Sequence, residues 1–358
     1  MTESEKITEQ YFGRFFLPQY TFGTVKMLEG KQETELCDCL IETGNCYVVI
    51  QIKEKSDENS GTKTDVDWFK KTVLKKAKQQ IKNTIRDLKK VNVTYFCDKT
   101  EIVIDNKKEI LPVIVFFNDN IETYDKLYYS EGLQTYINVF NKSDYQTMLD
   151  TIKTPTDIVR YLKQRKILVP KEGGSRYISN DLSVSLCETE EDYAKYYLRN
   201  AYGEISNYEN RVIVFNKILF DLNKNMSCSR NALIETMLCL DVSEIINVTE
   251  VYSNIIENIN IPNLAKPKLL TNGEWGVMLL RRPVGMKEVD FVNFLSDMGA
   301  YYTYVAKLKT CNAIIFEPTN TGLVTIKGAL SEMCYKGYDE QLETLKKEIE
   351  MVSWNSLY

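Results

Sequence analysis

The chain has 358 residues, a formal net charge of −5 and an apolar fraction of 44%. This length and composition are sufficient for two domains with ordinary hydrophobic cores. Histidine is absent, which excludes Ser-His-Asp and Cys-His catalysis and every histidine-ligated metal site. Any chemistry must therefore use carboxylates, lysine, amide side chains or a metal held by oxygen atoms.

The sequence predicts a cytoplasmic protein with no membrane partner. It has no run of roughly 18 apolar residues that could form a membrane-spanning helix. Its first residues, MTESEKITEQYF, are acidic where a signal peptide would be basic and then apolar. The nine cysteines include no C-x-x-C and lie mostly in apolar runs, which is typical of buried, reduced thiols.

Helix-like and strand-like patterns alternate from the N-terminus. Apolar residues at helical spacing predict a helix over 3–16, which Pro18 ends. Two β-rich runs, 36–42 and 46–53, flank Thr43-Gly44-Asn45 and predict a tight hairpin.

A long basic helix is predicted over 66–90, with one apolar face turned to the core. Strands are predicted at 91–97, 101–104 and 111–118. The last of these is nearly all apolar and is therefore expected to be central in a sheet. Residues 144–168 are expected to be helical. This order indicates an α/β fold.

A domain boundary is predicted at 169–180, where Pro170 and the Gly173-Gly174 pair interrupt the pattern. It separates a domain over 1–168 from an α+β domain over 181–358, whose role would be recognition, sensing or assembly. Helices are predicted there at 189–203, 231–258 and 340–350, and strands at 211–215, 275–281 and 312–316.

Charge is distributed unevenly along the chain. Residues 1–170 carry a net charge of +1 and the remainder −6, and 61–90 alone hold ten basic residues against three acidic ones. Such a run is either a solvated helix face or a surface for a phosphate backbone. The acidic C-terminal half would suit a protein partner, and Arg281-Arg282 is a weaker candidate for anion binding.

The hairpin carries the residues that best support chemistry. Gln51 and Lys53 are two apart on one strand and so point to the same face, and pairing across the turn brings Asp38 near them. The triplet [E/Q]-x-K occurs four times in the chain, but only Gln51–Lys53 ends an apolar strand that pairs with an Asp-bearing one. Oxygen ligands suit Mg²⁺, and a neighbouring lysine can stabilise charge on a phosphate.

The segment GKQETELCDCLIETGNCYVVIQIKEK resembles the PD-(D/E)XK nuclease superfamily, over about residues 1–168. Four features agree in order: an N-terminal helix with glutamates, an E-x-x-D element, a Q-x-K element, and a glutamine after a Lys-Ala stretch. They are Glu5 and Glu9, Glu35–Asp38, Gln51–Lys53, and Gln80 in KKAKQQIK.

The resemblance implies a restriction-endonuclease-like core, a mixed sheet flanked by helices, that binds Mg²⁺, with Mn²⁺ as a substitute. Asp38, Gln51 and the Ile52 carbonyl would hold the metal, and Lys53 would be the catalytic lysine. Glu35 and Glu5 would add negative charge, with Glu9 as the alternative to Glu5. The expected nucleic-acid contacts are Gln80, Lys75, Lys76, Lys78 and Lys82.

The expected function is that of a metal-dependent endonuclease, with DNA favoured over RNA, in restriction or antiphage defence. The resemblance also implies a homo-oligomer. The alternative is a non-catalytic module that binds nucleic acid or a protein, which the glutamine at 51 in place of glutamate favours. A phosphate-binding ATPase is excluded, because the chain has no G-x-x-x-x-G-K-[ST] motif.

Overall fold

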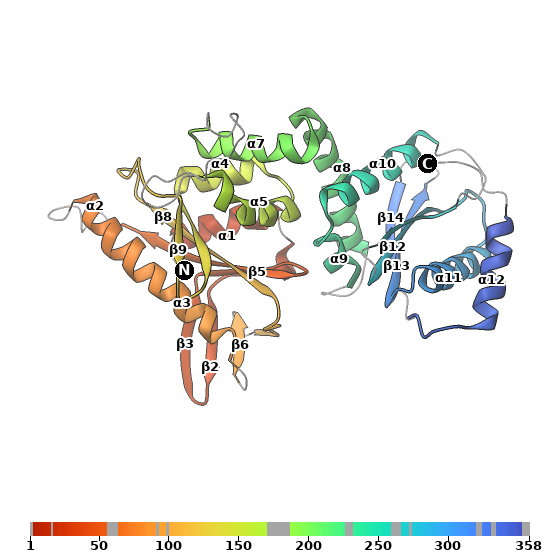
Figure 1. Cartoon of the computed structure of the whole chain (residues 1–358), viewed down its shortest axis with the longest axis horizontal. Coiled ribbons are helices and arrows are strands. Elements are labelled where there is room, and N and C mark those ends of the chain that lie inside the picture. The colour runs from red at the N-terminus through yellow and green to blue at the C-terminus, as the bar shows by residue number, and fades with distance from the viewer. Residues whose placement is uncertain are drawn as a thin grey trace. The chain divides into compact units, whose positions relative to one another are not determined.

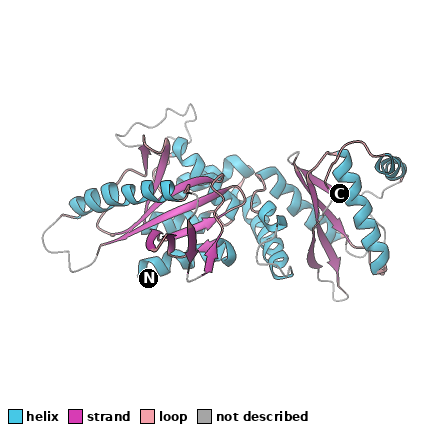
Figure 2. Cartoon of the chain, turned by 90° about the horizontal axis from the view of Figure 1, so that it is seen from below, coloured by secondary structure: helices cyan, strands magenta, loops and turns pink. Residues whose placement is uncertain are grey.

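The computed structural model divides the chain into two compact units, Met1–Tyr208 and Glu209–Tyr358. In both units mixed sheets are flanked by helices, which confirms the expected α/β class (Figures 1 and 2). The residues that the structure describes are 3–15, 17–55, 64–90, 93–97, 100–169, 187–225, 232–258, 266–271, 274–319, 324–330 and 334–352.

A six-stranded sheet forms the centre of the first unit, in the order β1-β4-β5-β8-β10-β9. Its three middle strands are parallel, and its outer strands pair antiparallel with their neighbours. The parallel strands are β5 (Cys46–Glu54), β8 (Glu109–Phe117) and β10 (Thr135–Asn141). The outer strands are β1 (Thr21–Phe22), β4 (Cys39–Glu42) and β9 (Leu127–Ser130). The apolar run at 111–118 is therefore central, as predicted.

The predicted hairpin is confirmed as β4 and β5. Cys39 lies opposite Ile50, and Glu42 lies opposite Tyr47. The Thr43 amide donates a hydrogen bond of 2.8 Å to the Cys46 carbonyl and closes the turn. Because the turn sets the register, the end of β5 lies beside the start of β4.

A long helix covers one face of this sheet, as predicted for 66–90. It comprises α2 (Asp65–Trp68), a π-helical segment (Phe69–Ala77) and α3 (Lys78–Asp87). The side chain of Thr64 caps its first turn by accepting from the Asp67 amide. An apolar residue recurs at every fourth position and packs into the core with Val49 of β5: Phe69, Val73, Ala77, Ile81 and Ile85.

The other helices of the first unit pack on the remaining face. They are α1 (Glu3–Phe15), which contacts β5, and α4 (Lys142–Thr151) and α5 (Pro155–Leu168), which contact β10. A further helix, α7 (Glu190–Tyr202), packs on α4 and α5 (Figure 1).

The division between units differs from the predicted boundary at 169–180, of which 170–180 lie outside the described residues. Helix α7 belongs to the first unit, where buried polar contacts connect it to α5. Arg165 of α5 and Glu190 of α7 form an ion pair of 2.9 Å with both side chains fully buried. The hydroxyls of Tyr197 and Tyr202 donate to the buried carboxylate of Asp157.

A smaller sheet in the first unit has the order β3-β2-β6-β7. Its strands are β3 (Gln32–Cys37), β2 (Val25–Glu29), β6 (Thr94–Cys97) and β7 (Thr100–Ile102). Strand β3 leads directly to β4, so the chain passes from the small sheet to the large one at Asp38.

The second unit has the sheet β11-β12-β13-β14, in which β12 and β13 are parallel. The strands are β11 (Lys268–Thr271), β12 (Trp275–Arg281), β13 (Thr310–Pro318) and β14 (Val324–Ala329). The described helices that lie wholly within this unit are α9 (Ala232–Met237), α10 (Val242–Glu257), α11 (Glu288–Val305) and α12 (Glu340–Met351).

The strand predicted at 211–215 is wrong, because these residues lie in α8 (Ile205–Asn225). Val212 and Phe215 are buried, whereas Ile213 between them is exposed. This spacing is helical, and the short apolar run concealed it. In the described part of the chain, no helix is both long enough and apolar enough to cross a membrane.

Candidate functional site

Asp38 lies at a bend between β3 and β4, where it faces the end of β5. Its side chain is buried, and its Oδ2 accepts a hydrogen bond of 2.5 Å from the Ile52 amide. Burial raises the pKa of Asp38, while the Lys53 charge and the bond from Ile52 act in the opposite direction. The carboxyl is thus held by β5 in a setting that disfavours its negative charge.

Lys53 reaches back along β5 toward Asp38. Its Nζ lies 3.7 Å from Asp38 Oδ2 and donates to the Ile52 carbonyl at 2.7 Å. Burial lowers the pKa of Lys53, Asp38 opposes that shift, and the positive charge of Lys76 adds to it. The long basic helix therefore acts electrostatically on the predicted catalytic lysine.

Gln51 is buried between these groups and the helix. Its Nε2 donates to the Leu36 carbonyl at 3.1 Å, and its Oε1 accepts a long bond of 3.4 Å from Lys53 Nζ. The structure thus brings together Asp38, Gln51 and Lys53, as the strand pairing predicted.

The two predicted accessory glutamates act on this cluster through their charges. Glu35 is exposed on β3, and Glu5 is half-buried on α1. Both charges raise the pKa of Asp38, and that of Glu35 also raises the pKa of Lys53. The side chain of Glu9, the alternative to Glu5, lies outside the described residues.

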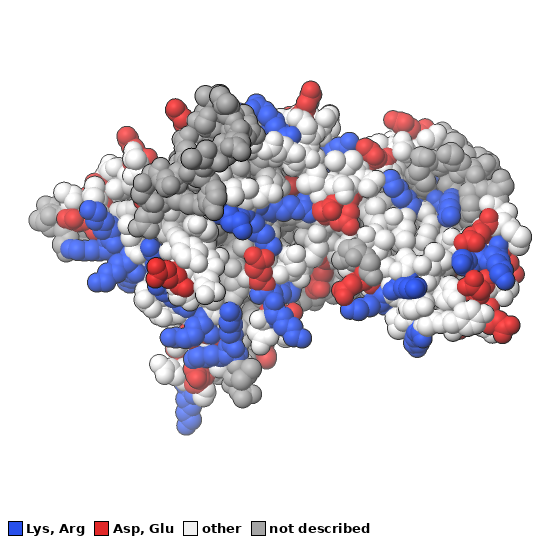
Figure 3. Space-filling model, viewed as in Figure 1, with Lys and Arg blue, Asp and Glu red and all other residues white. Residues whose placement is uncertain are grey.

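The residues predicted to contact nucleic acid lie along the long helix. Lys75 and Lys76 are exposed, Lys78 and Lys82 are half-buried, and Figure 3 shows basic side chains gathered over this part of the molecule. Lys78 Nζ lies 4.5 Å from the centre of the Tyr128 ring. Gln80 is half-buried, and its Oε1 is a buried atom with no hydrogen-bond partner among the described residues.

The oxygen atoms at this site are the kind of ligand that a hard divalent cation prefers, but they carry little negative charge. Oxygen atoms of Asp38, Gln51 and Ile52 lie at one strand end, and a cation there would offset the cost of burying the carboxylate. Within the described residues, however, no group of three cysteine, aspartate or glutamate side chains is placed to hold a metal. Gln51 supplies an oxygen without a charge, so the site depends on Asp38.

Two polar features near the site were not anticipated. The Thr84 hydroxyl of α3 donates to the same Leu36 carbonyl as Gln51. At the ends of β5 and β8, Asp65 accepts from Lys55 Nζ at 2.5 Å and from Asn118 Nδ2 at 2.9 Å. The Thr84–Leu36 bond spans 48 positions and the Asn118–Asp65 bond spans 53, so local spacing held no signal for these two contacts.

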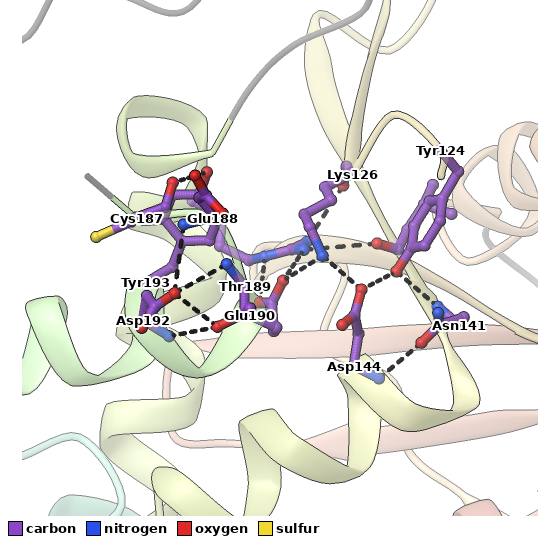
Figure 4. A network of polar contacts seen from close by, with 12 residues as sticks. Tyr124, Lys126, Asn141, Asp144, Cys187, Glu188, Thr189, Glu190, Asp192 and Tyr193 are labelled. Atoms are coloured by element: carbon purple, nitrogen blue, oxygen red, sulfur yellow. Dashed lines mark hydrogen bonds and ion pairs between the residues drawn. The ribbon is translucent and has the colours of Figure 1, made fainter. Parts of the chain in front are cut away.

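A separate pocket of about 870 Å³ opens between the long helix, α4 and α7. Figure 4 shows the network beside it, in which Lys126 pairs with Asp144 and, at 3.4 Å, with Glu190. The Tyr124 hydroxyl also donates to Asp144. These polar groups bind one another, so the network is a structural connection between α4 and α7.

No protein-family model, curated protein or solved structure matches the chain.

Proposed function

We propose that the first unit is a metal-dependent nuclease of the PD-(D/E)XK type that hydrolyses phosphodiester bonds as an endonuclease, with DNA favoured over RNA. The observation that supports this most strongly is the meeting of Asp38, Gln51 and Lys53 at one end of the β4–β5 hairpin. Restriction or antiphage defence is the proposed setting.

The order of elements also supports the proposal. A helix, α1, precedes the β4–β5 hairpin. The long helix follows the hairpin, and after β6 and β7 the chain enters β8, which runs parallel to β5. The order of helix, hairpin and second helix agrees with the order that the sequence resemblance implies for a restriction-endonuclease-like core. In this arrangement the end of β5, the start of β4 and one face of the basic helix lie close to Asp38 and Gln51.

Each residue has a definable role in this proposal. Asp38, Gln51 and the Ile52 carbonyl would hold Mg²⁺, or Mn²⁺ in its place. The metal, when bound, supplies polarisation of the phosphate and a more acidic water. The Lys53 ammonium would orient the attacking water and stabilise charge that develops on the phosphate. Lys75, Lys76 and their neighbours would bind the phosphate backbone.

A non-catalytic nucleic-acid-binding or protein-binding module is the second candidate. It is favoured by the shortage of carboxylates for a metal among the described residues. In that case Lys53 and Asp38 would serve as an internal ion pair at the strand end, and the basic helix would provide the binding surface.

Cleavage assays separate the two candidates. Plasmid, linear double-stranded DNA, single-stranded DNA and RNA would each be incubated with protein and Mg²⁺, Mn²⁺ or EDTA. Lys53→Ala tests the site, and Lys107→Ala, a change at an exposed turn, is the matched control. Metal-dependent cleavage that only Lys53→Ala abolishes supports the nuclease. No cleavage by the wild type, with no metal binding in calorimetry, supports the non-catalytic module.

A further inference from the structure

The Leu36 carbonyl is a shared acceptor beside the candidate site. It accepts one hydrogen bond from Gln51 Nε2 at 3.1 Å and another from the Thr84 hydroxyl. Gln51 and Thr84 are 2% and 1% exposed, so water cannot replace either bond. The carbonyl belongs to β3, Gln51 to β5 and Thr84 to α3, and one atom therefore joins three elements.

This acceptor determines which way the Gln51 amide points. A carbonyl oxygen accepts hydrogen bonds and cannot donate one. If the amide were reversed, Gln51 Oε1 would face the Leu36 oxygen, and two buried acceptors would repel each other without a proton between them. The observed orientation directs Oε1 toward Lys53 Nζ, 3.4 Å away.

The same acceptor accounts for glutamine where a glutamate would bring more charge to a metal. An ionised glutamate at 51 has no proton to donate, so one carboxylate oxygen would lie against the Leu36 oxygen. The position therefore requires a side chain that donates on one side and accepts on the other, and glutamine meets both requirements.

We propose that Thr84 and the Leu36 carbonyl form a positioning pair for Gln51, which holds the amide nitrogen and presents Oε1 to Lys53 and the metal. The metal part of this inference rests on the proposed nuclease function. Thr84 is the positioning residue: its hydroxyl lies between the Leu36 carbonyl and the Gln80 carbonyl, which is 3.0 Å away. It thereby fixes α3 against the end of β3, two residues before Asp38.

The closing experiment compares Thr84→Val, which keeps the shape and removes the donor, with Thr84→Ser, which keeps the hydroxyl. Nuclear magnetic resonance of the full chain would follow the side-chain NH₂ of Gln51, identified by its loss in Gln51→Glu. We expect faster hydrogen exchange of this NH₂ in Thr84→Val and wild-type exchange in Thr84→Ser. We also expect Thr84→Val to raise the Mg²⁺ concentration for half-maximal cleavage about 10-fold or more, as loss of a ligand's supporting partner does, with a smaller change in kcat.

Unchanged exchange and unchanged Mg²⁺ dependence in Thr84→Val would overturn the proposal, as would a Thr84→Ser variant as impaired as Thr84→Val. The Gln51→Glu variant adds a test that needs no activity: its thermal unfolding midpoint at neutral pH should be a few degrees lower than that of the wild type. If the wild type cleaves nothing, the nuclease proposal fails while the exchange and unfolding results still decide whether Gln51 is positioned in this way.

Discussion

The Lys53 ammonium lies 3.7 Å from the Asp38 carboxylate, with side chains 13% and 7% exposed. An ion pair that mainly stabilises a fold lowers the pKa of its acid and raises that of its base. Here burial outweighs the attraction, so the pKa of Asp38 is raised and that of Lys53 is lowered. Perturbed groups of this kind are frequent at functional sites, which supports the proposed role of the pair.

Replacing both members of this pair should therefore cost the fold little. We expect Asp38→Asn combined with Lys53→Met to leave the free energy of unfolding in metal-free buffer unchanged, or to raise it by about 1–4 kcal/mol. Urea unfolding of wild type and double variant would measure this. A clear loss of stability would mean that the pair is structural and would weaken the proposed site.

Lys53 should also control the rate of cleavage and its pH dependence. We expect Lys53→Ala to lower kcat by about 10²–10³-fold, as the loss of one group that stabilises developing charge does. Burial lowers the pKa of Lys53. The wild-type rate should therefore begin to fall at a lower pH than it would if the lysine had its ordinary pKa. Lys53→Arg should move this fall to higher pH, and pH–rate profiles of the two proteins would check it.

Asp157 gives a pH dependence that is independent of any activity. Burial raises the pKa of this carboxyl, although hydrogen bonds from Thr154, Tyr197 and Tyr202 oppose the shift. Its contribution to stability is therefore fully present below the unfolded value of about 3.9 and is lost as pH rises through the folded pKa. We expect the stability of wild type relative to Asp157→Asn to decline from acid toward neutral pH in denaturant titrations. A difference that does not vary with pH would contradict this.

Local patterns predicted that Asp38, Gln51 and Lys53 would lie together, whereas the polar contacts around them join residues far apart in the chain. The turn at Thr43 and the alternation along β5 sufficed to place Asp38 near Lys53, because both are properties of neighbouring residues. The bond from Thr84 to the Leu36 carbonyl spans 48 positions and has no local signature. The buried contact between Arg165 and Glu190, 25 positions apart, likewise has no local signature. It connects α7 to α5 in the first unit, whereas the predicted boundary placed this helix in the second domain.

That buried ion pair yields a stability prediction. Glu190→Gln should lower the free energy of unfolding by about 3–5 kcal/mol, because it removes the carboxylate that pairs with the buried Arg165 guanidinium. Arg165→Met should cost less, because Lys126 still lies 3.4 Å from the Glu190 carboxylate. The surface pair Lys195–Glu191, 40% and 52% exposed, is the matched control, and Lys195→Ala should change stability little because solvent screens it. Equal losses in the two sets would show that Arg165 and Glu190 are not specially coupled.

The basic helix should determine how strongly nucleic acid binding depends on salt. Lys75 and Lys76 are exposed, and no ion pair to a carboxylate is seen for either in the described part of the chain. Phosphates that they contact would release counterions, so Lys75→Ala with Lys76→Ala should reduce the slope of log affinity against log salt by about 2. Binding measured in EDTA needs no cleavage and so applies to both candidate functions.

Lys195→Ala with Lys217→Ala is the matched control, because it removes the same charge from two ion-paired lysines elsewhere. If this control reduced the slope equally, net charge rather than the helix would account for binding, and the proposed nucleic-acid surface would be wrong.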